Sequence, residues 1–534
     1  MIFIVGGMVF SGCVDNNESR QPIESAVPMV PISGGTAVIA IASEPDALNP
    51  LVWSTSVAGR IFAELHDGLT EMDDDLNYVP RIAHRWEVGA DRKSITYFMN
   101  RWRWSDGHPL TAYDVVRSYE LLVDPVVASP RRGGLREISS ATALDTFTVR
   151  YTFDRPQAEP EARSWHHILP LHIVGELDPG TVSSWPINSS PISSGEFLLE
   201  SWDHNRSLVL GQNPSYNRTS ALLDRVIFRI LPEAATRVLA LETGEVDLVN
   251  ALDPDAARRL LKTGKINISS VGGRSFYYLC WNLRNPIFQD QRTRQALSLA
   301  LDREMMLATL LKGYGKVANS PVPPALWNHH DQLPGPEFDP QKAREMLAIA
   351  GWRDDDGDGV LERDGVPFEF EILTRTGDPV RENGAVILRA NLADVGVKVD
   401  LCFMDLTSGL ARVHAGRFDS YLGRMNLNLF GDPTGIVGSQ ETDQFNYGHY
   451  ANTEVDSLLK VATGKMTRAE ALPVWLRLQA VLAVDQPAAY LLYPDNLVGV
   501  SKRLQNVRPH LLSPVNNLAE WWVAEDDRIY RTGK

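Results

Sequence analysis

The sequence predicts an α/β fold, mixed with α+β character, that is built from mixed sheets and divided into two or three domains. The chain has 534 residues, which is too long for a single hydrophobic core. Segments rich in β-branched and aromatic residues recur along it and predict strands. Between them lie helical patterns with recognisable caps, which indicates that strands and helices are interleaved in each domain.

Predicted strands occur from the start of the folded body to its last third. The body begins near Gly34, and residues 36–42 have strand-like composition before a Pro/Asn turn. We also interpret 425–430, Met-Asn-Leu-Asn-Leu-Phe, as a short and nearly neutral strand. Further strands are predicted where β-branched and aromatic residues alternate, at 94–100, 147–153, 225–231, 367–373 and 397–403.

Three helices have clear end signals. Residues 111–114 form a capping-box pattern, Thr-x-x-Asp, before an apolar run. Asp339 is a predicted N-cap with Pro340 at the first helical position, and Gly351 ends that helix. A third pattern predicts one continuous helix over 290–313.

Charge and composition exclude some classes of function. The formal net charge is −15, which argues against nucleic-acid binding, where a basic face is expected. Hydrophobic residues make up 44% and charged residues 22%, as in ordinary globular proteins. We therefore expect no nucleic-acid partner.

The N-terminus resembles an export signal. Residues 1–13 form a short apolar run that ends in Phe-Ser-Gly-Cys, which is similar to the lipobox of bacterial lipoproteins. This predicts a lipid anchor on Cys13 and an extracytoplasmic protein, periplasmic or on the cell surface. No Lys or Arg precedes the run, so a plain secretory signal or a chance apolar start stays open. Residues 14–33 are polar and Pro-rich and read as a tether.

The other two cysteines, Cys280 and Cys402, are too few to build a disulfide framework. One bridge between them and two free thiols are both compatible with the sequence.

Catalytic motifs are absent from the sequence. It contains no Gly-x-Ser-x-Gly elbow and no His-Glu-x-x-His pair, so we expect no enzyme. Three histidines cluster in 166–172, where a metal site competes with an ordinary apolar segment that ends at a proline. No cofactor is predicted.

An acidic loop resembles half of a calcium site. Asp354, Asp356 and Asp358 are followed by Gly359, as in the first half of a calcium loop. The twelfth position is Gly365 where the pattern requires Glu. The loop is therefore either a weak calcium site or a polar turn.

Several long segments together resemble the bacterial extracellular solute-binding proteins of family 5, the peptide/nickel type. The resemblance extends over about 34–525, and its segments occur in the family's order. One of them contains Trp-Ser-Asp-Gly followed by Thr-Ala-x-Asp-Val, and another contains Asn-Pro-x-Tyr. The matching segments are 94–125, 189–218, 238–249, 287–306, 338–359 and 446–459.

The resemblance implies a fold like a clam, with two lobes joined by two hinge strands and an extra domain inserted in the first lobe. The implied hinges lie near 282–285 and 497–500. The implied divisions are lobe one at 34–69, 189–282 and 500–534, the extra domain at 70–188, and lobe two at 283–499.

The implied function is capture of a small peptide or another polar solute in the inter-lobe cleft, and its delivery to an ABC permease complex by a monomer. A ligand-sensing or chaperone-like lipoprotein of the same fold is the alternative. The fold alone does not decide between them.

Residues 424–432 are the main candidate ligand contacts. In peptide-binding relatives, an aspartate three residues before the Asp-Pro pair holds the peptide's α-ammonium; here Leu429 takes that place if Asp432 sets the register. A shifted register would give the role to Asp432 itself. Asn426 and Asn428 offer amide donors and acceptors unless they are solvated strand residues, and Arg424 could clamp a carboxylate or phosphate. This set suits a neutral or anionic solute, such as a modified peptide or an oligosaccharide, at least as well as a free peptide.

Four more candidates follow from position in the family's fold. Ser54 and Thr55 follow the first strand, where the lobe-one loop lines the cleft. Tyr277 and Trp281 precede the first implied hinge and could stack on a ligand. Core packing is the alternative for each.

Overall fold

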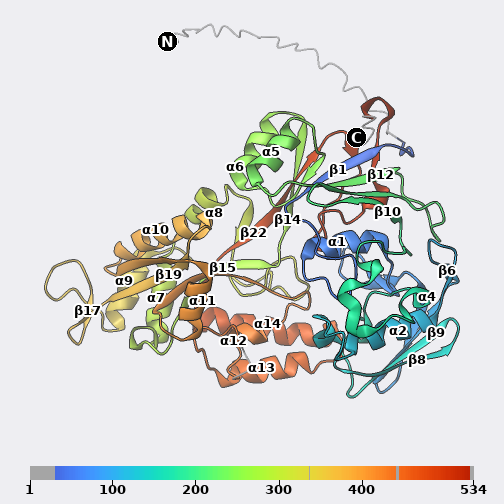
Figure 1. Ribbon diagram of the computed structural model, residues 1–534. Helices are drawn as coiled ribbons and strands as arrows, with labels where there is room; N and C mark the ends of the chain where they lie inside the picture. Colours follow the sequence, from blue (N-terminus) through green and yellow to red (C-terminus); the bar gives the residue numbers. More distant parts are fainter. Residues whose placement is uncertain (1–29, 336, 441–443, 529–534) are drawn as a thin grey trace, which may run out of the picture.

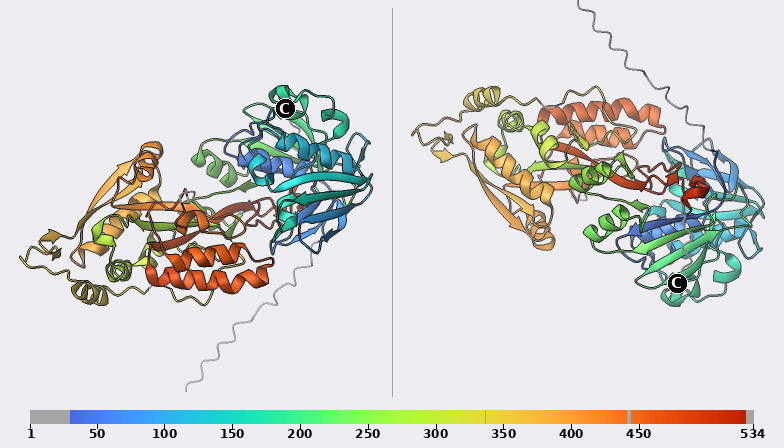
Figure 2. Two further views of the ribbon diagram at one scale, coloured as in Figure 1. Left: turned by 90° about the horizontal axis from the view of Figure 1, so that it is seen from below. Right: turned by 90° about the horizontal axis from the view of Figure 1, so that it is seen from above.

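The computed structural model describes residues 30–335, 337–440 and 444–528. The chain forms two lobes, with lobe two on the left of Figure 1 and lobe one with the extra domain on the right. Seen from above and below in Figure 2, the two bodies are joined by a narrower middle region. None of the described helices is both long and apolar enough to cross a membrane.

A large mixed sheet extends through both lobes and has the strand order β10-β11-β12-β1-β13-β22-β15-β21-β19-β20. In lobe one, β1 is parallel to β12 and to β13, while β10 and β11 extend the edge as antiparallel strands. The lobe-one strands are β1 (Thr36–Ile41), β10 (Phe197–Asp203), β11 (Ser207–Gln212), β12 (Arg225–Ile230), β13 (Leu248–Val249) and β14 (Ile266–Gly272). Its helices are α1 (Ser56–Leu65), α5 (Ala234–Glu242) and α6 (Pro254–Lys262).

The extra domain is built on a separate four-stranded antiparallel sheet of order β4-β5-β9-β8. Its core contains the fully buried Trp104, Tyr97 and Tyr151, which bury large aromatic surfaces. Its strands are β2 (Thr70–Met72), β3 (Tyr78–Pro80), β4 (Ala83–Val88), β5 (Ser94–Met99), β6 (Trp102–Arg103), β7 (Pro109–Leu110), β8 (Ile138–Asp145) and β9 (Thr148–Phe153). Its helices are α2 (Ala112–Val123), α3 (Pro160–Ser164) and α4 (Leu171–Val174), with short 3-10 turns at Arg132–Leu135, Pro179–Ser184 and Pro186–Asn188.

In lobe two, β19 lies parallel to both β20 and β21, and β21 continues the sheet to β15. Helices cover both faces, and α13 packs against α14 at the bottom of Figure 1. The strands are β15 (Ser275–Trp281), β16 (Gly315–Val317), β17 (Glu362–Arg363), β18 (Val366–Pro367), β19 (Glu369–Arg375), β20 (Lys398–Met404), β21 (Ser420–Asn426) and β22 (Ala488–Ser501). The helices are α7 (Gln291–Leu299), α8 (Arg303–Leu310), α9 (Pro340–Ile349), α10 (Pro379–Ala393), α11 (Leu406–His414), α12 (Thr434–Val437), α13 (Thr453–Thr463) and α14 (Arg468–Asp485), and a 3-10 turn lies at Pro286–Phe288.

After β22 the chain returns to lobe one. The strands β23 (Leu504–Gln505) and β24 (Trp522–Val523) pair there, with 3-10 turns at Leu518–Glu520 and Glu525–Asp527. The fully buried Trp521 joins the lobe-one core beside β1 and β12, so the C-terminal segment completes lobe one.

Two segments carry the chain between the lobes. The C-terminal half of β22 pairs with β14 in lobe one, and its N-terminal half pairs with β15 in lobe two. The second crossing runs from β14 to β15 through Gly273 and Arg274. At Gly273 a Cβ atom would lie 3.1 Å from the Pro494 carbonyl oxygen, so the two crossings touch.

Most of the predicted strands and caps are confirmed. The strands predicted at 36–42, 94–100, 147–153, 225–231, 367–373 and 397–403 correspond to β1, β5, β9, β12, β19 and β20. The capping box of Thr111 and Asp114 is present at α2, and Asp339 caps α9 by accepting a hydrogen bond from the Lys342 N–H.

Two predictions about local structure are wrong. The single helix expected at 290–313 is two helices, α7 and α8, because Asp302 caps α8 and the buried Arg303 donates to the Ser298 carbonyl across the break. The strand expected at 425–430 ends at Asn426, because the chain turns between Asn428 and Gly431.

Candidate functional site

The start of β15 and the end of β21 bring several predicted residues together. Tyr277 lies opposite Arg424, and Ser275 lies opposite Asn426. The Arg424 guanidinium donates to Ser275 Oγ at 3.1 and 2.8 Å and lies 5.4 Å from the centre of the Tyr277 ring. Both Arg424 and Asn426 are exposed, so their polar groups face outward from this edge.

A second cationic group stands where the parallel strands of lobe two end. Arg375 is the last residue of β19, and its Nε is buried without a hydrogen-bond partner among the described residues. Arg381, near the start of α10, pairs with Asp378 at 2.8 Å. Burial raises the pKa of Tyr421, and the nearby Arg381 and Arg375 partly offset this. Carboxyl ends of parallel strands are the usual place for ligands in such sheets.

The crossing between the lobes adds another arginine. Arg274 donates through Nη1 to the Leu427 carbonyl at 2.7 Å, and burial lowers its pKa. In the described part of the chain, no carboxylate lies within ion-pair distance of Arg274, Arg375 or Arg424. The three residues lie at one end of the lobe-two sheet, in a chain of net charge −15. Strand alternation places Arg375 on the face of Tyr421 and Arg424 on the face of Tyr277. We call these three residues the arginine group.

The turn after β21 holds the remaining predicted contacts in a fixed conformation. The backbone carbonyl of Asn428 accepts a hydrogen bond from the Gly431 N–H at 3.1 Å. Its side-chain oxygen accepts a second one from the Asp432 N–H at 3.2 Å. Asp432 Oδ1 accepts from both the N–H and the hydroxyl of Thr434, at 2.8 and 2.5 Å. Leu429 is half-buried at this turn. One carboxylate oxygen of Asp432 is thus already occupied by its own chain.

Glycine is required within that turn. Gly431 has φ of +69°, and a Cβ atom there would lie 1.9 Å from Asn328 Oδ1. The Asn328 amide donates to the Gly431 carbonyl at 2.9 Å, which fastens the turn to lobe two.

Ser54 and Thr55 lie in lobe one at the start of α1. Their hydroxyls donate to Asp46 at 2.7 and 2.8 Å, and Thr55 also caps α1. Partial burial raises the pKa of Asp46, but the hydrogen bonds from Ser54 and Thr55 outweigh it and bring this pKa to about 2. Among the described residues, neither hydroxyl contacts the arginine group.

Trp281 is placed apart from the other candidates, at the far end of β15. It is fully buried and stacks on Phe288, with ring centres 5.1 Å apart and Phe370 at its edge. This is the environment of a core residue, and its role as a ligand contact stays a prediction.

Comparison with known proteins identifies the family. Residues 77–446 match the family model described as bacterial extracellular solute-binding proteins, family 5 Middle. This is more than half of the chain. The protein belongs to this family.

Individual relatives of this family-5 protein are moderately similar over nearly their whole length. The oligopeptide-binding protein AppA of Bacillus subtilis is 28% identical over 533 residues, 98% of each chain. Protein XP55 of Streptomyces lividans is 28% identical over 494 residues, 90% of this chain and 89% of the other.

Solved structures of relatives have the same two-lobed fold. AppA of B. subtilis in complex with a nonapeptide has a TM-score of 0.70 and 28% identity, covering 93% of this chain and 100% of that one. NikZ of Campylobacter jejuni in complex with Ni(L-His) has a TM-score of 0.72 and 25% identity, covering 91% and 99%.

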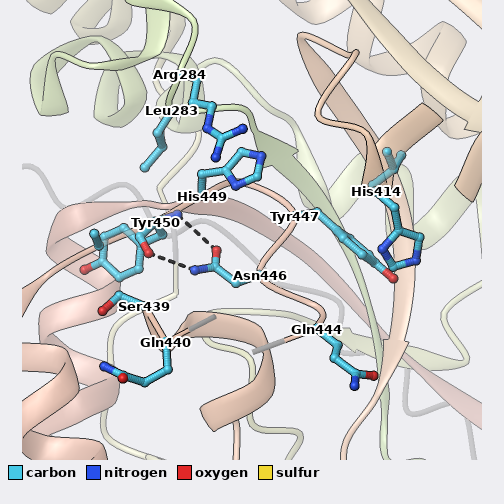
Figure 3. A pocket seen from close by; sticks show the side chains of 12 residues that line it. Leu283, Arg284, His414, Ser439, Gln440, Gln444, Asn446, Tyr447, His449 and Tyr450 are labelled. Atoms are coloured by element: carbon cyan, nitrogen blue, oxygen red, sulfur yellow. Dashed lines mark hydrogen bonds between the residues drawn. The ribbon is translucent and has the colours of Figure 1, made fainter. Parts of the chain in front are cut away.

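A separate cavity of about 480 Å³ lies in lobe two of this family-5 protein, beyond the C-terminal end of β15 (Figure 3). Side chains of Arg284, His414, Tyr447 and His449 line part of it. Asn446 exchanges two hydrogen bonds with the backbone of Tyr450 in its wall. None of the residues predicted as ligand contacts lines this cavity.

The other sequence candidates have different environments. Asp354, Asp356 and Asp358 come together with Glu362, with carboxylate oxygens all within 4.8 Å of one another, and calcium binding there stays a prediction. Cys280 and Cys402 are both free thiols. Cys13 lies outside the described residues.

Sequence reasoning missed most of the arginine group. It found Arg424 from the motif next to it, but not Arg274 or Arg375. The signal for Arg375 was its position two residues after the predicted strand 367–373, which the structure extends to Arg375 and pairs in parallel with both of its neighbours. Arg274 carried no comparable signal, because the crossing was expected nearer 282–285.

Proposed function

We propose that this family-5 protein captures a peptide, or another polar solute with a negatively charged group, between its lobes and delivers it to an ABC permease. The relatives named for oligopeptide binding support a peptide-like solute. The arginine group supports the proposal about charge, because none of its three cations has a carboxylate partner among the described residues. No enzymatic step is part of the proposal.

A carboxylate or phosphate of the solute would supply the missing counter-charge. Arginine donates two parallel hydrogen bonds to such groups, and these charge-assisted bonds are stronger than neutral ones. The Arg424 guanidinium donates two hydrogen bonds to Ser275 Oγ, and these bonds hold the side chain in place. The amides of Asn426 and Asn428 would contact the rest of the solute. Tyr277 is buried beside the Arg424 guanidinium, so its contact with the solute stays a prediction.

Ser54 and Thr55 would meet the solute from lobe one. Their hydroxyls are now bonded to Asp46, so they would contribute through the rigid start of α1. We keep the extra domain at 70–188 as part of the proposal, and move the boundary between lobe one and lobe two from 282 to 272–275, since β15 pairs with β21 of lobe two. The crossings at 272–275 and within β22 would act as hinges, and a solute would shift the lobes toward closure by its higher affinity for the closed state.

The proposed place of action is outside the cytoplasm, with a lipid anchor on Cys13 and a monomeric protein. The family description as extracellular supports the compartment. Metabolic labelling with palmitate should label the wild type and not Cys13→Ser. Equal labelling of the two would contradict the anchor without affecting solute binding.

The charge proposal is tested by calorimetric titration with short peptides that have either a free or an amidated C-terminus. Arg375→Gln and Arg424→Gln should each weaken binding of the free carboxylate form by about tenfold or more, since a hydrogen bond to a charged group contributes roughly 1.5–3 kcal/mol. Binding of amidated peptides should change little.

Arg389→Gln is the matched control, because Arg389 is an exposed arginine on α10, the same helix that carries Arg381. If the free and amidated peptides bind wild type equally, and the variants match Arg389→Gln, the arginine group does not hold the solute's charge. Failure of the protein to stimulate any permease, despite tight binding, would favour a sensing role instead.

A further inference from the structure

We propose that the extra domain binds a divalent transition-metal ion through Asp106, His108 and His172. One ligand atom from each residue lies within 4.8 Å of the others. His172 Nε2 is 2.6 Å from Asp106 Oδ2, and His108 Nδ1 is 3.3 Å from Asp106 Oδ1. The two imidazole rings stack, with centres 4.0 Å apart and planes 18° apart. Two imidazoles and one carboxylate thus converge on one place.

The three residues come from two segments that the fold brings together. Asp106 and His108 lie in the turn between β6 and β7, and His172 lies in α4. The turn is tight, with Trp104 N–H donating to the His108 carbonyl at 2.9 Å and Gly107 at φ of +90°. The backbone N–H of His108 also donates to Asp106 Oδ1 at 3.1 Å, which orients the carboxylate.

A single buried aspartate holds both segments in place. Asp114 Oδ1 accepts from Trp104 Nε1 at 3.2 Å, on the side of the turn, and from Leu171 N–H at 2.8 Å, on the side of α4. Its Oδ2 accepts from Thr111 in the capping box of α2. Trp104 and Asp114 are almost entirely buried. The positions of the turn and α4 are therefore fixed before any ion binds, which is the arrangement that supports metal sites.

The donor set determines which ions fit. Imidazole nitrogens with one carboxylate oxygen suit Zn²⁺, Co²⁺, Ni²⁺ and Cu²⁺, while Ca²⁺ and Mg²⁺ prefer oxygen alone. Side-chain exposure is 57% for His108, 28% for Asp106 and 23% for His172. An ion can therefore enter from solvent, and water can complete its coordination.

The three histidines of 166–172 do not form one cluster in the structure. His166 and His167 are buried in the core of the extra domain, among aromatic rings. His172 alone points to the surface, where it meets His108. The spacing within 166–172 was therefore misleading, because the second imidazole comes from a different segment.

The test is a Zn²⁺ titration of full-length protein made without a histidine tag, followed by calorimetry. Excess Ca²⁺ is present to occupy oxygen-only sites such as the cluster of Asp354 and Glu362. We expect one Zn²⁺ per wild-type chain. His108→Ala and His172→Ala should each weaken this binding by at least about tenfold, since losing even a supporting group of a metal site costs roughly 10–100-fold.

His84→Ala is the control, because His84 is an exposed histidine on β4 of the same domain. Co²⁺ absorption gives a second readout, since the wild type should show visible bands that His172→Ala lacks. Melting curves without metal check that the variants are folded, and Zn²⁺ should raise the melting temperature only in wild type and His84→Ala. Unchanged Zn²⁺ binding in folded His108→Ala and His172→Ala, or loss of binding in His84→Ala, would overturn the proposal. Absence of a Zn²⁺ site in the wild type would leave Asp106 and His172 as a plain ion pair and overturn it as well.

Discussion

Arg468, the first residue of α14 in lobe two, forms an ion pair with Glu159 of the extra domain, with Nε 2.7 Å from Oε1. The same guanidinium donates to the Leu76 carbonyl at 3.1 Å and lies 5.4 Å from the centre of the Trp327 ring. Lobe two therefore contacts the extra domain at a point far from the two hinge crossings. A second contact joins the same two bodies, where the Arg163 guanidinium lies 5.2 Å from the centre of the Phe430 ring.

Arg468→Ala should loosen that contact and shift the protein toward more open shapes. The pair is about three-quarters buried, so its removal costs about 1 kcal/mol, enough to change a two-state ratio about fivefold. Small-angle scattering of the free protein should show a larger radius of gyration. Arg477→Ala is the matched control, since Arg477 on the same helix pairs with Glu454 within lobe two and is exposed. Equal radii for both variants and wild type would show that the Arg468 contact does not limit opening.

Stability should fall in mild acid because the extra domain buries neutral histidines. Burial lowers the pKa of His166 to about 4 and that of His167 to about 3. Unfolded histidine has a pKa near 6.5, so between these values the unfolded chain binds more protons. The contribution of these two histidines to the free energy of unfolding therefore rises with pH across this window. It is lost progressively as the pH falls below about 6.5.

His167→Phe isolates one of these contributions. At pH 5 the loss from His167 is roughly 2 kcal/mol, and the phenylalanine variant should lack it. Urea unfolding at pH 7 and pH 5 measures the difference for each protein, so that other titrating groups cancel in the comparison. His84→Phe, at an exposed position, should keep the wild-type pH dependence. An unchanged pH dependence in His167→Phe would mean that this ring is protonated in the folded state.

Local sequence signals predicted elements well and long-range contacts poorly. Strands such as β5 and β12 and the cap at Asp339 depend on a few neighbouring residues, so they could be read directly. The break between α7 and α8 was missed because it depends on the buried Arg303, whose Nε donates to the distant Tyr490 carbonyl. No periodicity in the helix itself records that contact.

In the candidate site, too, local sequence signals could be read and long-range contacts could not. Arg424 was found because an Asp-Pro motif next to it fixed a register, whereas Arg375 and Arg274 reach the site only through the sheet order. Likewise, the pairing of His108 with His172 follows from Asp114 holding two segments together, which sequence spacing cannot show. Sequence alone therefore predicted the family and, within the arginine group, only Arg424.

The turn after β21 should tolerate no side chain at its glycine. Gly431→Ala combines φ of +69° with a clash against the fully buried Asn328. Destabilisation should exceed about 1 kcal/mol in urea unfolding, and solute affinity should fall because Leu429 and Asp432 shift. Gly365→Ala separates the two causes, since Gly365 also has positive φ but open space around it. If both variants lose the same stability, Asn328 simply moves aside.

Leu429→Asp should create affinity for peptides with a free N-terminus. The wild-type turn offers such an ammonium no carboxylate at 429, and Asp432 Oδ1 is already occupied by Thr434. A close charge pair in a shielded site could add about 2 kcal/mol, roughly thirtyfold in dissociation constant. Calorimetric titration should show this gain for free peptides and none for N-acetylated ones, with Leu429→Asn as the uncharged control. If wild type already binds free peptides tightly and acetylation abolishes that binding, another acid, such as Asp432 through Oδ2, holds the ammonium and Leu429 does not mark the subsite.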